Sequence, residues 1–235
     1  MYGYGFYNDS SIILVVIGTL LCLITSGIVK STFAKYSKVA SMSGMTGAQV
    51  ADAILRKEGI YDAKVEPIAG SLTDHFNPAT KVVSLSESVY GSSSIAAISV
   101  AAHECGHAMQ HNEDYFPLKI RSSILPVANF GSKYGLWMVI LGLIISFFRP
   151  IVFIGVVLFA FGVLFQVVTL PVEFDASRRA LETISEMGIL GEQEMTGAQK
   201  VLKSAAMTYV ASAAASILSL IRLILIAQGG RSRRD

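Results

Sequence analysis

Four apolar runs constrain the fold of this 235-residue chain more than any other feature. They cover residues 11–29, 123–148, 151–170 and 205–227, and the second has its firmest core at 136–148. A run of about 20 apolar residues matches the thickness of a bilayer core, where backbone polar groups must be paired within a helix. Charged residues make up 15% of the chain, against about 25% in an average globular protein. The sequence therefore predicts a mainly α-helical membrane protein with about four transmembrane helices.

Basic residues beside the first run predict how the chain is oriented. Lys30, Lys35 and Lys38 follow that run at once, so the positive-inside rule puts the N-terminus outside and the next segment in the cytoplasm. The C-terminal tail contains three arginines, Arg231, Arg233 and Arg234. A spanning final run would leave these arginines outside, against the same rule. A re-entrant or surface-lying final helix is therefore the alternative.

Charge and cysteine content exclude other classes of protein. The net charge is +2, and no basic stripe with interleaved aromatic residues is present, so nucleic acid is not an expected partner. Cys22 lies in the first apolar run and Cys105 lies in a different, motif-bearing segment. No disulfide is expected between them. We expect Cys105 to be a small packing residue rather than a nucleophile.

A metal-binding motif lies between the first two apolar runs. His103, Glu104 and His107 form the pattern His-Glu-x-x-His within 94–110, a stretch that is rich in alanine and free of proline. On a helix, residues four apart lie one above the other on the same face. The two imidazoles can therefore bind one Zn²⁺, and Glu104 can accept a proton from a metal-bound water. The pattern predicts a zinc hydrolase site.

The residues around the motif predict a small α+β domain. Thr46 and Gln49 make a capping box for a helix that ends at Gly59, and residues 195–199 repeat 45–49 as a second expected helix start. Residues 64–68 and 81–85 read as strands, joined by a turn-rich segment. An edge strand there can hold an extended peptide substrate. The alternative is a hairpin that merely covers the motif helix.

Two histidines make only part of a catalytic zinc site, which needs three protein ligands. His111 lies one turn beyond the motif, without the glycine turn that precedes a third ligand in metzincins. His75 lies upstream, while Glu113 and Asp114 follow closely after the motif helix. Glu173 lies just beyond the third apolar run. Two spans separate Glu173 from the motif and would return it to the same side of the membrane, which favours it as the third ligand.

The chain resembles the YugP-type neutral zinc metallopeptidases of bacterial membranes along essentially its whole length. The similarity rests on the first apolar run and on residues 72–78, 85–87, 102–108 and 170–179. The chain is more distantly similar to HtpX-type heat-shock peptidases and CAAX prenyl endoproteases, whose third ligand is the Glu of a Glu-x-x-Ala-Asp motif. Glu173 and Ala176 match that motif, and Ser177 replaces its Asp. That Asp orients a zinc-bound His, a role that Ser177 can fill only weakly.

The resemblance implies a zincin-like endopeptidase that cuts membrane or membrane-proximal proteins in protein quality control. Zn²⁺ would be held by His103, His107 and Glu173, with Glu104 as general base. Among donors for the oxyanion, His75 is slightly preferred over His111 and Arg178. The alternative role for His75 is structural, capping its turn with Asp74.

The expected domain organisation follows the apolar runs. An anchor (1–30) precedes a cytoplasmic catalytic domain (31–122), a transmembrane hairpin (123–171), a helical segment that carries Glu173 (172–204), and a final helix with its basic tail (205–235). The expected partners are a protein or peptide substrate and the lipid bilayer of the plasma membrane. Two other functions stay open, namely a non-proteolytic scaffold or chaperone with a vestigial or regulatory zinc site, and a metal transporter.

Overall fold

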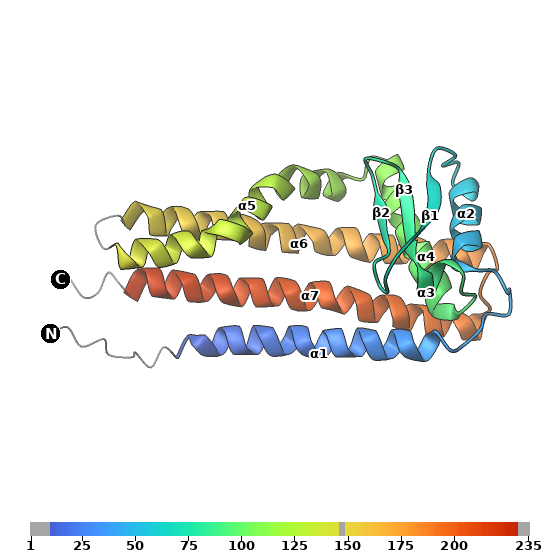
Figure 1. The fold of residues 1–235 in the computed structure, drawn as a ribbon, viewed down its shortest axis with the longest axis horizontal. Helices are drawn as coiled ribbons and strands as arrows, with labels where there is room; N and C mark the ends of the chain where they lie inside the picture. The colour runs from blue at the N-terminus through green and yellow to red at the C-terminus, as the bar shows by residue number, and fades with distance from the viewer. Residues whose placement is uncertain (1–9, 146–148, 230–235) are drawn as a thin grey trace. The chain divides into compact units, whose positions relative to one another are not determined.

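A computed structural model of the chain describes residues 10–145 and 149–229 (Figure 1). Among these residues, four helices are long and apolar enough to cross a membrane. They are α1 (Ile12–Tyr36), α5 (Phe116–Ile144), α6 (Arg149–Glu186) and α7 (Glu192–Gly229). The mainly α-helical membrane fold expected from the sequence is confirmed. Residues 1–9 and 146–148 and the arginine-rich tail lie outside the described residues.

The long helices extend past the limits of the apolar runs. At about 1.5 Å per residue, the 38 residues of α6 span about 57 Å, against about 30 Å for a bilayer core. The helix therefore continues beyond the apolar run and carries Glu173 without a break. Likewise α7 is a continuous helix of 38 residues, which is not the interrupted helix that a re-entrant segment would need.

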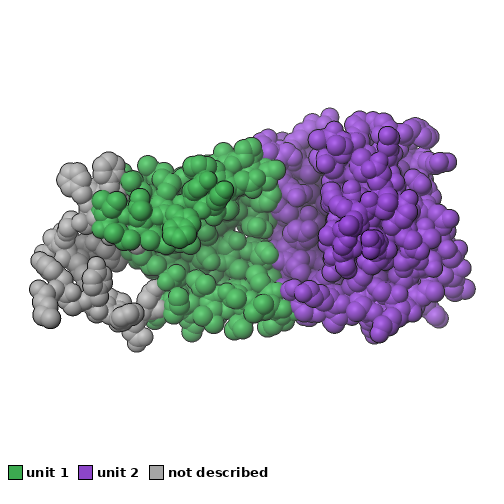
Figure 2. Space-filling view, in the orientation of Figure 1, with its two compact units in different colours: residues 1–24, 124–167, 211–235 green, residues 25–123, 168–210 purple. Residues whose placement is uncertain are grey.

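The described residues divide into two compact units (Figure 2). The first unit comprises 10–24, 124–145, 149–167 and 211–229, and contains no strand. Within it, small residues let helices approach closely: a Cβ at Gly155 would lie 2.9 Å from the backbone nitrogen of Val139, and one at Gly18 would lie 2.9 Å from the Cα of Ala215. Such contacts are typical of membrane helices, whose association depends on packing.

The second unit comprises residues 25–123 and 168–210 and contains the sheet. Its shorter elements are α2 (Gly47–Lys57), β1 (Lys64–Ile68), β2 (His75–Asn77), β3 (Val82–Ser86), α3 (Glu87–Tyr90) and α4 (Ile95–Asn112). The apolar faces of α2, β3 and α4 form a common core in which α4 is almost wholly buried. The metal-motif helix is therefore the centre of this unit.

The two copies of the Met-Thr-Gly-Ala-Gln segment behave differently. The first starts α2 as expected, because the Thr46 side chain accepts from the Gln49 amide and the Gln49 side chain accepts from the Thr46 amide. The second copy lies inside α7, so the expectation that it starts a helix was wrong. There, Glu194 accepts a hydrogen bond from the amide of Gly191 at 2.8 Å, which starts the helix earlier.

The expected small sheet is present, and it is not the simple hairpin that was the alternative. The two expected strands are present as β1 and β3, but they pair in parallel, with Lys64 opposite Val82. The intervening segment, expected as a turn, contains β2, which pairs antiparallel with β3 and gives the order β1-β3-β2. The carboxylate of Asp74 accepts from the backbone amide of Ser86 at 2.7 Å and from its hydroxyl at 3.0 Å. This side-chain anchor, rather than a strong strand pattern, holds the three-residue strand in place.

Cys105 is a packing residue, as expected. Its side chain is fully buried, and its thiol donates to the carbonyl oxygen of Ala51 on α2 at 3.6 Å. Burial raises the pKa of the Cys105 thiol well above its usual value, so the reactive thiolate is disfavoured. Neither Cys22 nor Cys105 forms a disulfide, as the sequence predicted.

Helices α4 and α6 touch backbone to backbone at Gly106. A Cβ built on Gly106 would lie 2.5 Å from the carbonyl oxygen of Ala176 and 3.0 Å from its Cα. Real Cβ atoms do not approach other atoms this closely. Only glycine therefore permits this crossing, and the small side chain of Ala176, itself fully buried, completes it.

We predict that Gly106→Ala destabilises the protein by about 1–3 kcal/mol, the usual cost of overpacking a dense core. Thermal unfolding in detergent would measure the change. The matched control is Gly91→Ala, where a Cβ meets no atom within 4 Å and φ is −95°. Equal unfolding temperatures for the two variants would contradict the close α4–α6 contact.

Candidate metal centre

Three side chains from two helices meet in the second unit. The Nε2 atoms of His103 and His107 on α4 lie 3.3 and 3.6 Å from Oε2 of Glu173 on α6. The two imidazole rings are nearly perpendicular, with their centroids 4.8 Å apart, so both present a nitrogen to the same carboxylate. Among the described residues, this is the one group of three or more such side chains close enough to hold a metal ion.

The buried carboxylate of Glu173 fits a bound cation. Only 3% of its side chain is exposed, and Oε2 has no hydrogen-bond partner among the described residues. An unsatisfied buried carboxylate oxygen carries a large desolvation cost. Ligands of a tetrahedral zinc with bonds of about 2.0–2.1 Å lie roughly 3.3 Å apart, close to the separations seen here. The residues therefore suit a divalent metal ion.

Each histidine is oriented through its other ring nitrogen. The Nδ1 atom of His103 lies 3.2 Å from the hydroxyl of Ser177, and Nδ1 of His107 lies 3.1 Å from Oε1 of Gln110. The amide nitrogen of Gln110 already donates to other groups, so its oxygen must accept from His107. The Nε2 lone pair of His107 therefore faces Glu173, which is the tautomer that a metal ligand needs.

Gln110 belongs to a buried polar network that sequence reasoning missed. It is fully buried, and its amide nitrogen donates to the carbonyl of Val172 at 2.7 Å and to Asp175 at 2.9 Å. Asp175 in turn accepts from Arg179 at 2.6 Å, and Arg179 donates to Glu113 at 2.8 Å. Gln110 was overlooked because a glutamine three residues after a histidine is unremarkable until the helix is known to be buried.

Glu104 is held by the sheet. Its Oε2 accepts a hydrogen bond from the backbone amide of Phe76 on β2 at 3.1 Å, and only 8% of the residue is exposed. The amide of Phe76 points away from β3, to the outer edge of this three-residue strand. Its hydrogen bond to Glu104 means that this amide cannot also bind a peptide at the edge. The sheet thus serves first to orient Glu104.

The field around the histidines favours a positive charge. Burial lowers the pKa of His107, but the nearby carboxylates of Glu173 and Glu104 raise it more, so its pKa lies above the usual value. Arg121 on α5 lies on the other side of the ligand carboxylate, with Nη1 3.9 Å from Oε1 of Glu173. On α7, Tyr209 interacts electrostatically with Glu104 and Glu173. Neither Arg121 nor Tyr209 was singled out from the sequence.

The remaining candidates do not belong to the described group of three side chains that could hold a metal ion. His75 is exposed, and its Nδ1 lies 2.9 Å from the carbonyl oxygen of Thr73. The ring of His111 is 5.9 Å from that of Phe76. Arg178 pairs with Asp175 and Glu182 on its own helix. Glu113 forms an ion pair with Arg179, and Asp114 forms one with Lys119.

Comparison with known proteins agrees with this arrangement. The model of a family described as "Putative neutral zinc metallopeptidase" matches residues 11–228. A relative from Bacillus subtilis (strain 168), named "Putative membrane protease YugP", is 48% identical over 203 residues, which cover 86% of this chain and 90% of the relative. No solved structure matches the chain. The resemblance drawn from the motifs is confirmed, and the chain belongs to this neutral zinc metallopeptidase family.

Proposed function

We propose that this chain is a zinc-dependent endopeptidase in which His103, His107 and Glu173 hold the metal and Glu104 is the general base. The observation that carries the proposal is the buried Oε2 of Glu173, which faces two imidazole nitrogens and lacks a hydrogen bond. A structural scaffold would gain nothing from the desolvation cost of this buried carboxylate. It would also not need the carboxylate of Glu104 beside the first histidine.

The chemistry divides between the metal and Glu104. Zinc, when bound, supplies a Lewis acid that polarises a peptide carbonyl and lowers the pKa of water. The carboxylate of Glu104 accepts the proton of the attacking water and delivers it to the nitrogen of the leaving amine. The hydrogen bond from the Phe76 amide fixes Oε2 of Glu104, so the base is oriented before substrate arrives.

A further donor is needed for the oxyanion of the tetrahedral intermediate. Arg121 is better positioned for this role than His75, because its guanidinium lies 3.9 Å from the ligand carboxylate whereas the ring of His75 is exposed. We therefore propose Arg121 as the donor and retain His75 as a candidate that the same activity assay can test.

The proposed substrates are membrane or membrane-proximal proteins, consistent with a role in quality control. Glu173 follows directly on the apolar part of α6, which ends at Leu170, so the reacting groups belong near the membrane surface. The lysines after the first span and the basic residues Lys119 and Arg121 before the second favour the cytoplasmic side. Zinc analysis together with a casein-cleavage assay, with and without chelator, tests the function as a whole.

Glu104→Gln is expected to leave zinc stoichiometry unchanged and to lower kcat by a factor of roughly 10²–10⁴, the usual contribution of a general base. The glutamine keeps an oxygen that can accept from Phe76, so the fold should be unaffected. Metal analysis and casein turnover on the same purified sample provide the measurement. Turnover at the wild-type rate would rule out the assigned base.

Glu173→Ala is expected to remove most of the bound zinc, since the site loses its only anionic ligand. Metal content after dialysis against a weak chelator measures the loss, with Glu66→Ala, an exposed carboxylate on β1, as the control. If Glu173→Ala retains zinc at the level of the control, the third ligand must be another residue.

Gln110→Ala is expected to weaken zinc binding by about 10- to 100-fold, because the orientation of His107 depends on Gln110. Competition with a fluorescent chelator would measure the affinity. The control is Gln199→Ala, which removes an exposed side chain from α7. An unchanged affinity in Gln110→Ala would assign Gln110 a purely structural role.

A further inference from the structure

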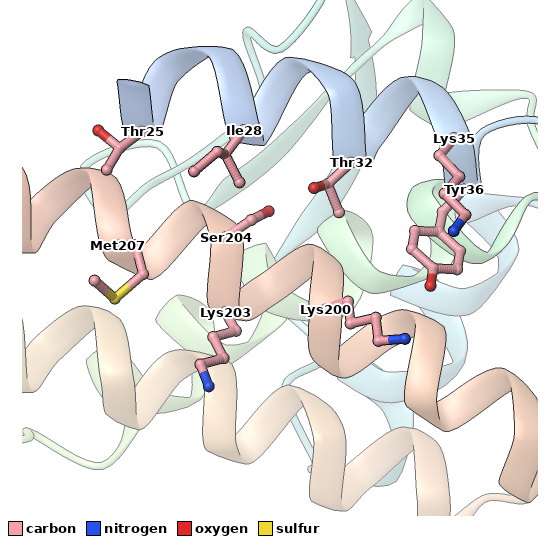
Figure 3. Close-up of a pocket in the computed structure, with 9 residues that line it drawn as sticks. All are labelled: Thr25, Ile28, Thr32, Lys35, Tyr36, Lys200, Lys203, Ser204 and Met207. Carbon is pink, nitrogen blue, oxygen red and sulfur yellow. The ribbon is translucent and has the colours of Figure 1, made fainter. Parts of the chain in front are cut away.

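A groove separate from the metal centre runs between α1 and α7 within the second unit (Figure 3). It has a volume of about 400 Å³. One end is walled by Ile28 of α1 and by Met207 of α7, and Thr32 and Ser204 lie further along. Nothing in the proposed peptidase chemistry uses this groove.

The other end of the groove is strongly basic. Lys35 of α1 and Lys200 of α7 line this end, Lys203 lines the groove beside Ser204, and no acidic residue lines it. Three of the other described lysines, Lys57, Lys81 and Lys119, pair with carboxylates. No described carboxylate lies within ion-pair distance of the three groove lysines. The groove therefore holds positive charge that the neighbouring protein does not neutralise.

The basic end is shaped by close packing. A Cβ on Gly197 of α7 would lie 2.8 Å from Cε1 of Tyr36, so only glycine lets this ring lie against the helix. The ammonium of Lys35 lies 5.5 Å from the centroid of the same ring. Tyr36 thus closes this end and brings a hydroxyl that can donate a hydrogen bond.

The groove lies where both helices change from polar to apolar. On α1 the apolar run ends before Lys30, and on α7 the final apolar run begins just after Lys203. Lys35 and Ile28 are seven residues apart, or about 10 Å along a helix. This spacing is close to the depth of a lipid headgroup layer, about 5–8 Å on each side of the hydrocarbon core. The basic end thus matches the headgroups, and the apolar end matches the acyl chains.

We propose that this groove binds one anionic phospholipid. Lys35 and Lys200 bind the headgroup phosphate, Lys203 adds positive charge from α7, and an acyl chain packs on Ile28 and Met207. Uncompensated positive charge selects a lipid of net negative charge, because the ammonium of a zwitterionic headgroup would be repelled. The proposal does not depend on the peptidase chemistry, since the described residues that line the groove are not the proposed metal ligands.

Binding is tested on the full chain purified in neutral detergent, by native mass spectrometry with dioleoylphosphatidylglycerol, dioleoylphosphatidylcholine or inorganic phosphate. The phosphatidylglycerol is expected to bind at one molecule per chain and more tightly than the phosphatidylcholine. Each lysine near a membrane surface contributes about a fivefold gain in affinity. The triple variant Lys35→Gln/Lys200→Gln/Lys203→Gln is therefore expected to bind phosphatidylglycerol on the order of 100-fold more weakly.

The matched control is Lys30→Gln/Lys38→Gln/Lys64→Gln, which removes the same charge from exposed positions that do not line the groove. It should retain wild-type binding of phosphatidylglycerol. Equal losses of phosphatidylglycerol affinity in the two triple variants would mean that general surface charge accounts for the binding, and would overturn the proposal. Equal binding of phosphatidylcholine, or displacement of the lipid by equimolar phosphate, would also overturn it.

A second variant keeps every charge and fills the groove. Thr32→Trp inserts a large ring between α1 and α7 and is expected to prevent binding of phosphatidylglycerol. Unchanged zinc content and unfolding temperature in lipid-free detergent would show that it folds, and Ser31→Trp, on an exposed position of α1, is its control. Wild-type lipid affinity in folded Thr32→Trp would overturn the proposal. Should Thr32→Trp not fold, the two triple lysine variants decide the matter.

Discussion

The contact on which the site depends is the backbone-to-backbone crossing of α4 and α6 at Gly106 and Ala176. Glu173 lies one turn before Ala176 on α6, and the two histidines flank Gly106 on α4. A Cβ on Gly106 would clash with the backbone of Ala176, so a larger side chain there would push the two helices apart. The 3.3 Å and 3.6 Å separations among the ligand atoms therefore follow from the absence of a side chain between them.

The residues that contact the two histidines do not include the aspartate of the related Glu-x-x-Ala-Asp motif. Ser177 occupies that position and reaches His103 with a neutral hydroxyl. The negative charge is instead on Asp175, which acts on the other histidine through the amide of Gln110. Each imidazole is thus oriented, but only His107 is connected to a carboxylate network. We infer that the two ligands contribute unequally to metal affinity.

Much of the fold could be predicted from the sequence because the controlling signals are local. Apolar runs specify spanning helices, and the spacing of His103 and His107 places both on one helical face. The two spans before Glu173 were expected to return it to the side of the motif, which made it the favoured third ligand, and the structure brings all three side chains together. β2 was missed, because three residues have no detectable periodicity and an Asp74–Ser86 anchor defines the strand.

Features that depend on tertiary contacts could not be predicted in this way. Gln110 is ordinary in sequence and becomes significant only when α4 is buried against Val172 and Asp175. The second Met-Thr-Gly-Ala-Gln segment has the same local chemistry as the first, but Glu194 starts its helix earlier and Gly197 serves to admit Tyr36. The role of Arg121 depends on the proximity of α5 to Glu173, which no spacing rule encodes.

The division of the ligands between α4 and α6 also has a consequence for biosynthesis. The histidines are synthesised well before Glu173, and the apolar part of α5 and of α6 lies between them in the chain. A nascent chain that has not yet inserted these helices possesses two imidazoles and a carboxylate base, but no complete metal site. In the proposed peptidase, the three metal ligands can therefore come together only after both intervening helices have been synthesised.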